Sequence, residues 1–189
     1  MSSERQFRLF VAASAPVEQL RWLAEAAVEL RERWPTARWA AAENQHITLK
    51  FLGATPPDRL EAVESVCRSV AAGRAPGSLR LGGAGVFPSL RRVRVLWVGL
   101  EDPSALLASL AGDLDAALEP LGYRTESRGY TPHLTLARFR DPARMEALPK
   151  LPEAPAPFRV GSIGLWRSYL SPRGARYEQL AELPLGHAA

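Results

Sequence analysis

Apolar residues along the chain follow helical spacing in some segments and strand spacing in others, which predicts an α+β protein. Between residues 17 and 34 they recur at three- and four-residue steps, as on one face of a helix, until Pro35 ends the pattern. The same spacing predicts helices over 58–72 and from Asp102 to Leu121. Short apolar or alternating runs predict strands over 7–13, 38–41, 46–52, 79–86, 93–100, 131–139, 163–170 and 176–183.

Two of these strands carry the same pattern of polar residues. In the segment HITLKFL, alternation places His46, Thr48 and Lys50 on one face and apolar residues on the other. A second strand contains HLTL, in which His133 and Thr135 repeat the arrangement. Residues i and i+2 of a strand project from the same face, so each motif directs an imidazole and a hydroxyl the same way.

The two motifs are 87 residues apart, close to half of the 189-residue chain. Each half offers a strand, an amphipathic helix and an H-x-T-L strand, which indicates a degenerate two-fold repeat. We therefore predict one domain over 1–189, built from two pseudo-symmetric lobes. Each lobe is expected to be an antiparallel-rich sheet with helices packed outside, and the lobes are expected to face each other across a central cleft.

Such a cleft would bring two imidazoles and two hydroxyls together. With an ordinary pKa near 6.5, one histidine can accept a proton while its partner donates one, and threonine hydroxyls can stabilise charge that develops on phosphate oxygens. The chain has only three histidines, and two of them lie in these motifs. The third, His187, lies near the C-terminal end and is expected to take no part in the chemistry.

Composition says less about the class of protein than the two motifs do. The chain is 47% hydrophobic and 23% charged, as in soluble globular proteins, and we expect it to be a cytoplasmic monomer with no membrane segment. Its net charge is +4, and 22 of its 24 basic residues are arginine. Arginine favours phosphate-bearing partners, although genomic base composition can produce the same bias. The single cysteine, Cys67, excludes an internal disulfide and is expected in the core.

Several segments resemble one known family. HITLKFLG and PHLTLAR are similar to the two signature motifs of the 2H phosphoesterases, and specifically of the RNA 2′,3′-cyclic phosphodiesterase branch, also called the 2′-5′ RNA ligase family. RLFVAAS, GVFPSLRRVRVLWVGL and GARYEQLAELPL are also similar to family segments and occur in the expected order. The resemblance covers almost the whole chain.

The resemblance implies an activity and a catalytic pair. The family opens the 2′,3′-cyclic phosphate at the 3′ end of RNA to a 2′-phosphate without a metal or another cofactor, and some members also join tRNA halves through a 2′-5′ linkage. By match to the motifs, His46 would be the proton donor and His133 the proton acceptor. Thr48 and Thr135 would donate hydrogen bonds to phosphate oxygens.

The resemblance also suggests substrate-binding residues. Arg138 matches a family position tied to phosphate binding, but it lies five positions after His133, so the strand must bend or end by Ala137 for the guanidinium to reach the site.

Three further residues are candidates for contacts with RNA. Lys50 is in phase with His46 and is expected either to contact the RNA backbone or to lie at a solvated rim. Phe10 and Tyr130 are candidates to stack on a terminal base, with core packing as the alternative.

Other functions remain open on the sequence. A metallohydrolase would need a third ligand from an Asp, a Glu or His187. An RNA-binding or ligation-accessory protein is compatible with the basic charge. A 2H phosphodiesterase could also act on another cyclic or 2′-5′-linked nucleotide instead of RNA ends.

Overall fold

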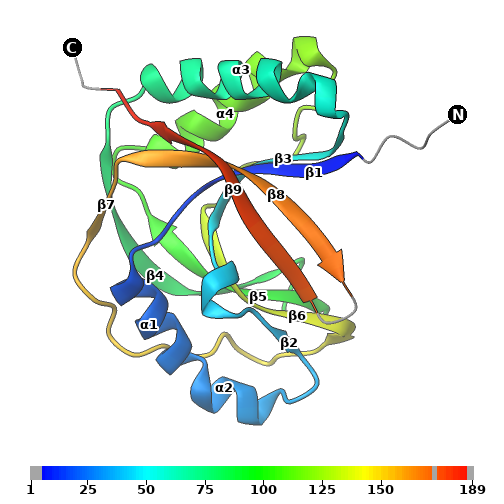
Figure 1. Ribbon diagram of the computed structural model, residues 1–189. Coiled ribbons are helices and arrows are strands. Elements are labelled where there is room, and N and C mark those ends of the chain that lie inside the picture. Colours follow the sequence, from blue (N-terminus) through cyan, green and yellow to red (C-terminus); the bar gives the residue numbers. More distant parts are fainter. Residues whose placement is uncertain (1–5, 172–173, 187–189) are drawn as a thin grey trace, which may run out of the picture.

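In the computed structural model, which describes residues 6–171 and 174–186, nine strands form one curled antiparallel sheet (Figure 1). Eight of them follow the order β7-β4-β5-β6-β3-β1-β8-β9, and β2 pairs with β6 beside this path. The strands are β1 (Phe7–Ala13), β2 (Arg38–Trp39), β3 (Ile47–Thr55), β4 (Gly77–Phe87), β5 (Val93–Glu101), β6 (His133–Ala143), β7 (Phe158–Val160), β8 (Ser162–Ser171) and β9 (Gly174–Pro184).

Helices cover the sheet in two pairs. Helices α3 (Leu60–Ala72) and α4 (Leu106–Leu118) pack side by side at the top of Figure 1, and α1 (Val17–Ala26) and α2 (Val28–Arg33) lie at the bottom. The helix predicted over 17–34 is thus two helices that meet at Ala27. Single 3₁₀ turns complete the helical elements: η1 (Ala42–Asn44), η2 (Pro57–Arg59) and η3 (Glu119–Leu121).

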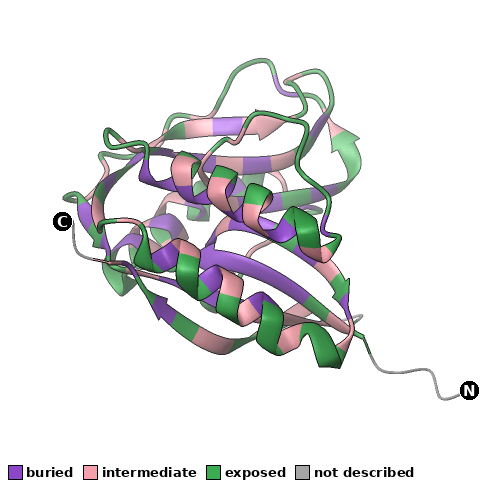
Figure 2. Cartoon of the chain, turned by 90° about the horizontal axis from the view of Figure 1, so that it is seen from above, coloured by how far each residue is buried: buried purple, intermediate pink, exposed green. Residues whose placement is uncertain are grey.

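The core lies between the helices and the sheet. Figure 2 shows buried residues on the helix faces that turn towards the strands and exposed residues on the outer faces. On α3 the inward stripe is Val63, Cys67 and Ala71, all fully buried. The prediction that Cys67 is a core residue is confirmed, and burial raises the pKa of its thiol to about 12.

The helix predicted from Asp102 begins at Leu106, and the carboxylate of Asp102 fixes its start. The side chain of Asp102 accepts hydrogen bonds from the backbone N–H groups of Leu106 (3.0 Å) and Leu107 (2.7 Å). Two of the four N–H groups that have no partner inside the helix are satisfied in this way.

The predicted α+β class and the outer position of the helices are confirmed, but the two halves do not form separate sheets. Strands β7-β4-β5-β6 and strands β3-β1-β8-β9 meet where β3 pairs with β6, at the residues Ile47 and Leu134. The two motif strands thus pair with each other at the first residue of β3 and the second residue of β6. This pairing joins the predicted lobes into one continuous sheet.

Candidate active site

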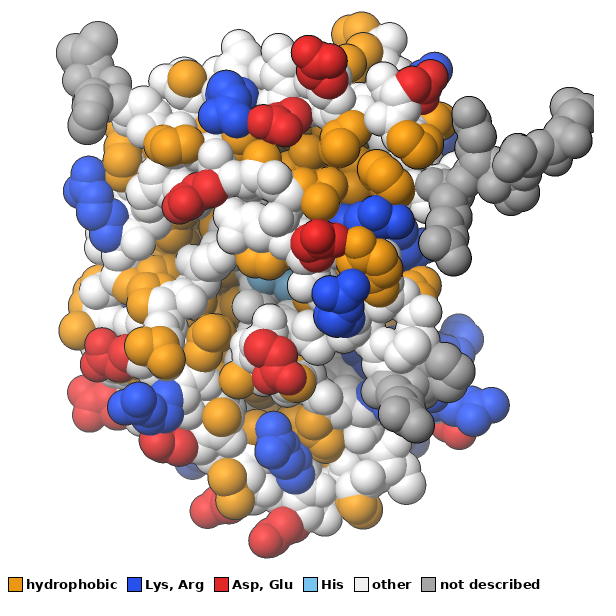
Figure 3. Space-filling view, viewed as in Figure 1, with side chains coloured by type: hydrophobic (Ala, Val, Ile, Leu, Met, Phe, Trp, Pro, Cys, Tyr) orange, Lys and Arg blue, Asp and Glu red, His pale blue; other side chains and the backbone are white. Residues whose placement is uncertain are grey.

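The two H-x-T motifs meet at the junction between the halves of the sheet. The antiparallel pair Ile47–Leu134 is fully buried, and its register places His46 beside Thr135 and Thr48 beside His133. Because neighbours in a strand alternate between faces, all four polar side chains project from the face opposite to the buried pair. Figure 3 shows a hollow near the middle of the molecule with a histidine side chain at its bottom.

The two imidazoles are held by the same kind of hydrogen bond. Nδ1 of His46 lies 2.8 Å from the carbonyl oxygen of Asn44, and Nδ1 of His133 lies 2.7 Å from that of Thr131. A carbonyl oxygen can only accept, so Nδ1 carries the proton in both rings. Nε2 is therefore the nitrogen that exchanges protons in each ring.

Aromatic rings surround both histidines. The ring centroid of His46 lies 4.7 Å from that of Phe10 and 5.0 Å from that of Tyr177. The ring centroid of His133 lies 5.2 Å from that of Phe87 and 5.8 Å from that of Trp97. These walls remove water from the imidazoles and restrict their orientation.

Burial and charge lower the pKa of both histidines. Desolvation is the main cause for His46 and lowers its pKa to about 4, although the bond to Asn44 opposes the shift. The positive charge of Arg138 lowers it further, and so does His133 when that ring is protonated. The pKa of His133 is lowered by burial and by Arg138. Both imidazoles are therefore neutral at pH 7 in the free protein, and Arg138 acts electrostatically on both.

A β-bulge brings Arg138 to the face of the histidines. Thr135 and Ala137 of β6 pair with consecutive residues of β5, so Leu136 is one residue extra. Leu136 and Ala137 both point into the core, and the alternation resumes one position later with Arg138 exposed. The bend that the sequence required for this guanidinium is present, and Arg138 shares a face with His133.

A matching bulge in β3 turns Lys50 away from this face. Thr48 and Lys50 pair with consecutive residues of β1, which leaves Leu49 extra. Lys50 is 2% exposed, forms an ion pair with Asp115 and donates a hydrogen bond to the carbonyl of Arg124. The expectation that Lys50 contacts RNA or lies at a solvated rim is therefore wrong, because the bulge shifts the alternation on which it was based.

The same bulge brings Phe51 to the site, although strict alternation places this residue on the apolar face of the strand. Phe51 pairs with Phe10, shares the face of His46 and is 60% exposed. It lies five residues after His46, as Arg138 lies five residues after His133. This equal spacing is the signal that could have identified Phe51.

The two aromatic residues proposed from the sequence are engaged within the protein. Phe10 is 3% exposed and stacks with Trp166 as well as contacting His46. The hydroxyl of Tyr130 donates a 3.0 Å hydrogen bond to the backbone carbonyl of Thr48, and its ring packs against the core. Core packing, the alternative for both residues, agrees with these contacts. Tyr130 thus connects the segment that precedes the second motif to the strand of the first motif.

Arg38, which lies in no sequence motif, lies next to Arg138. The short strand β2 pairs with β6 in a register that sets Arg38 opposite Arg138. Directly paired residues of an antiparallel sheet share a face, so Arg38 also projects from the face of the histidines. No local sequence pattern predicts this pairing, because the two arginines are 100 positions apart.

Neither a metal-binding cluster nor a membrane-spanning helix occurs among the residues that the structure describes. In residues 6–171 and 174–186, no three His, Cys, Asp or Glu side chains gather where they could hold a metal ion. No helix in this part of the chain is long and apolar enough to cross a membrane. His187, the third histidine, lies outside the described residues.

The sequence is similar to one protein family over most of its length. The family model described as the 2′-5′ RNA ligase superfamily matches residues 10–171. An RNA 2′,3′-cyclic phosphodiesterase of Methanothermobacter thermautotrophicus is 36% identical over 148 residues, which cover 76% of this chain and 79% of that relative. A Geobacillus stearothermophilus protein with the same name is 33% identical over 93% of this chain, which spans only 56% of that relative.

Solved structures agree in fold over nearly the whole chain. A Thermus thermophilus protein has a TM-score of 0.82 at 29% identity, covering 96% of this chain and 100% of its own. The E. coli LigT structure with 3′-AMP has a TM-score of 0.78 at 27% identity, covering 96% of this chain and 99% of its own.

Proposed function

This chain belongs to the 2′-5′ RNA ligase superfamily, and on that basis we propose that it hydrolyses the 2′,3′-cyclic phosphate at the 3′ end of RNA to a 2′-phosphate without a metal ion. The observation that carries the proposal is the matched pair of imidazoles, each with Nδ1 bound to a carbonyl and Nε2 available for proton transfer. Relatives named as RNA 2′,3′-cyclic phosphodiesterases and the binding of 3′-AMP by LigT support this substrate class.

The proposed reaction is a single displacement at phosphorus. A water oxygen forms a bond to phosphorus while the bond from phosphorus to the ribose O3′ breaks. Nε2 of His133 takes a proton from the water, and Nε2 of His46 gives one to the departing O3′. The product carries a 2′-phosphate and a free 3′-hydroxyl. A 5′-hydroxyl of a second RNA in place of water would give a 2′-5′ linkage by the same bond changes.

The pKa values show what the donor role requires. His46 is the more buried imidazole, and in the free protein its pKa of about 4 favours the neutral ring. A bound phosphate carries a negative charge that raises the pKa of a neighbouring imidazole. In this proposal, substrate binding therefore supplies the charge that allows His46 to hold the proton it donates.

The remaining side chains on this face suit the substrate. The hydroxyls of Thr48 and Thr135 can donate to the non-bridging phosphate oxygens, and the guanidinium of Arg138 can neutralise their charge. The exposed ring of Phe51 offers a flat surface for the terminal base, a role that Phe10 and Tyr130 do not have free surface to fill.

The test is to incubate the protein with short RNA that ends in a 2′,3′-cyclic phosphate, with and without a chelator, and to identify the product. We expect a 2′-phosphate in both conditions. His46→Ala and His133→Ala should each lower the rate at least about a hundredfold. His187→Ala is the control and should leave the rate unchanged. A 3′-phosphate product, or wild-type rates in either motif variant, would contradict the assignment.

Other outcomes would favour the alternatives. Loss of activity with the chelator would indicate a metallohydrolase. Tight binding of the RNA with no product would indicate an RNA-binding or ligation-accessory protein. Turnover of another cyclic or 2′-5′-linked nucleotide but not of RNA ends would place the chain elsewhere among the 2H phosphodiesterases.

A further inference from the structure

Arginines continue beyond the candidate active site along strands β2 and β6. Arg138 is the first of them, Arg38 lies opposite it on β2, and Arg140 lies two residues further along β6. All three are exposed. We call Arg38 and Arg140 the outer arginines. Strands β2 and β6 lie at the lower right of Figure 1, and Figure 3 shows basic side chains along this margin of the molecule.

The strand geometry directs the outer arginines to the side of the histidines. Phe139, between Arg138 and Arg140, is 7% exposed and packs edge-on against Trp34 of the helical layer. Its neighbours in the strand therefore project from the opposite side, which is the face that carries His133. Arg38 shares that face through its pairing with Arg138.

The outer arginines have no partner for their charge in the described part of the chain. Neither guanidinium forms an ion pair or a side-chain hydrogen bond there, and nearby Asp141 forms no ion pair with either. By contrast, Arg74 and Arg68 pair with Asp113 and Glu64. Unpaired guanidiniums on one face produce a positive potential and keep their donors free for an anionic ligand.

We propose that the outer arginines bind the RNA chain that precedes the terminal nucleotide, by contacts to its phosphodiester groups. This inference rests on the proposed function and adds the residues that contact the nucleotides before the terminal one. Arg138 and Arg140 are two strand residues apart, about 7 Å, a distance on the scale of one nucleotide of an extended strand. The fork of donors on each guanidinium fits two oxygens of one phosphate.

The test compares two substrates that share the reacting group. One is a nucleoside 2′,3′-cyclic monophosphate, and the other is a four-nucleotide RNA with the same terminal nucleotide and cyclic phosphate. For Arg38→Gln and Arg140→Gln we expect KM for the tetranucleotide to rise roughly three- to tenfold, because each loses one charged phosphate contact. The kcat for both substrates and the KM for the mononucleotide should stay within about twofold of wild type.

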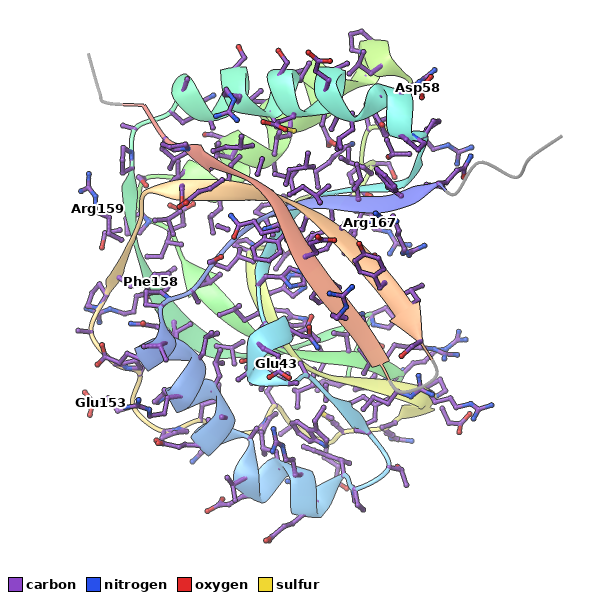
Figure 4. All side chains as sticks on the ribbon, in the orientation of Figure 1. Glu43, Asp58, Glu153, Phe158, Arg159 and Arg167 are labelled. Atoms are coloured by element: carbon purple, nitrogen blue, oxygen red, sulfur yellow. The ribbon has the colours of Figure 1, made fainter. Side chains whose placement is uncertain are left out.

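Salt dependence and a matched variant control this result. With the tetranucleotide, the slope of log kcat/KM against log salt should fall by about 0.7 for each phosphate contact removed. Arg159→Gln is the control, because Arg159 is an exposed arginine in the middle of β7, an edge strand that β4 and β5 separate from β6 (Figure 4). It should change neither KM nor the salt slope.

Each outcome distinguishes this inference from the proposed function. An unchanged tetranucleotide KM in both variants, or equal losses on both substrates, would overturn the role of the outer arginines while leaving the hydrolysis in place. If wild type hydrolyses neither substrate, the proposed function fails. Fluorescence anisotropy with the labelled tetranucleotide then decides the inference, since affinity that does not fall in Arg38→Gln or Arg140→Gln contradicts it.

Discussion

Phe51 and Arg138 occupy equivalent positions in the two halves of the sheet. Each lies five residues after a motif histidine, just beyond a one-residue bulge, on the face that carries the imidazoles. The two halves share their backbone pattern but present an exposed aromatic ring on one side and a guanidinium on the other. A symmetric frame thus carries an asymmetric pair of side chains, which suits a substrate with a base at one end and a phosphate at the other.

Removing the aromatic surface of Phe51 should weaken substrate binding. Stacking of a base on an aromatic side chain contributes about 1–3 kcal/mol, so Phe51→Ala should raise KM at least about fivefold with little change in kcat. Phe51→Trp, which keeps a flat ring, should retain wild-type KM. Steady-state kinetics on a cyclic-phosphate RNA measure both values. A Phe51→Ala variant with unchanged KM would show that the base lies elsewhere.

Removing the charge of Arg138 should change both the rate and its pH dependence. The positive charge lowers the pKa of both His46 and His133, so Arg138→Gln should raise both pKa values. Burial and Arg138 both lower the two pKa values, so the bell-shaped profile of kcat/KM should be centred below pH 6.5 in wild type. In Arg138→Gln the profile should move to higher pH. The rate should fall about a hundredfold, as for loss of a donor to a charged transition state.

The shift of this profile separates an electrostatic role from a structural one. An arginine that only supported the fold would lower the rate without moving the pH limbs in a fixed direction. Arg138→Lys keeps the positive charge and should keep the wild-type profile even if its rate is lower. A profile for Arg138→Gln that stays in place, or moves to lower pH, would contradict this account.

Burial of His46 should also appear in the stability of the fold. Its pKa is near 6.5 in the unfolded chain and about 4 in the folded protein, so the unfolded state takes up a proton first as the pH falls. The contribution of His46 to the free energy of unfolding is constant above pH 6.5 and is lost progressively between pH 6.5 and 4. The loss between pH 7 and pH 5 is about 2 kcal/mol.

Chemical denaturation of wild type and His46→Gln at pH 7 and pH 5 measures this contribution to the free energy of unfolding. The free energy of unfolding of His46→Gln should fall by about 2 kcal/mol less than that of wild type on the same change of pH. Comparing the two proteins removes the contributions of carboxylates and of His133, which are common to both. Parallel losses would mean that His46 is not desolvated in the folded protein.

The ion pair between Lys50 and Asp115 should contribute to the stability of the fold and not to RNA binding. Lys50→Met leaves the partly buried Asp115 without its cation and should lower the free energy of unfolding by about 3 kcal/mol. The double variant Lys50→Met/Asp115→Leu removes both charges and should recover most of this loss. Urea denaturation measures both. A Lys50→Met variant with wild-type stability and raised KM for RNA would instead restore the role expected from the sequence.

Spacing along the chain predicts most of the helices and strands and the paired H-x-T pattern. Helical and strand spacing depend on nearest neighbours along the chain, so most helices and strands and the buried side of Cys67 could be predicted. Spacing does not predict the three-residue strand β7, because it is too short to show a period. The H-x-T spacing was sufficient to place an imidazole and a hydroxyl on one face of each motif strand.

Which other side chains reach the site depends on how distant strands pair. The bulges at Leu49 and Leu136 arise from the register of β3 against β1 and of β6 against β5. They turn Lys50 into the core and bring Phe51 and Arg138 to the face of the histidines. Register depends on contacts between distant segments, and a slip of one residue reverses every later side chain, so strict alternation assigns the wrong face beyond a bulge.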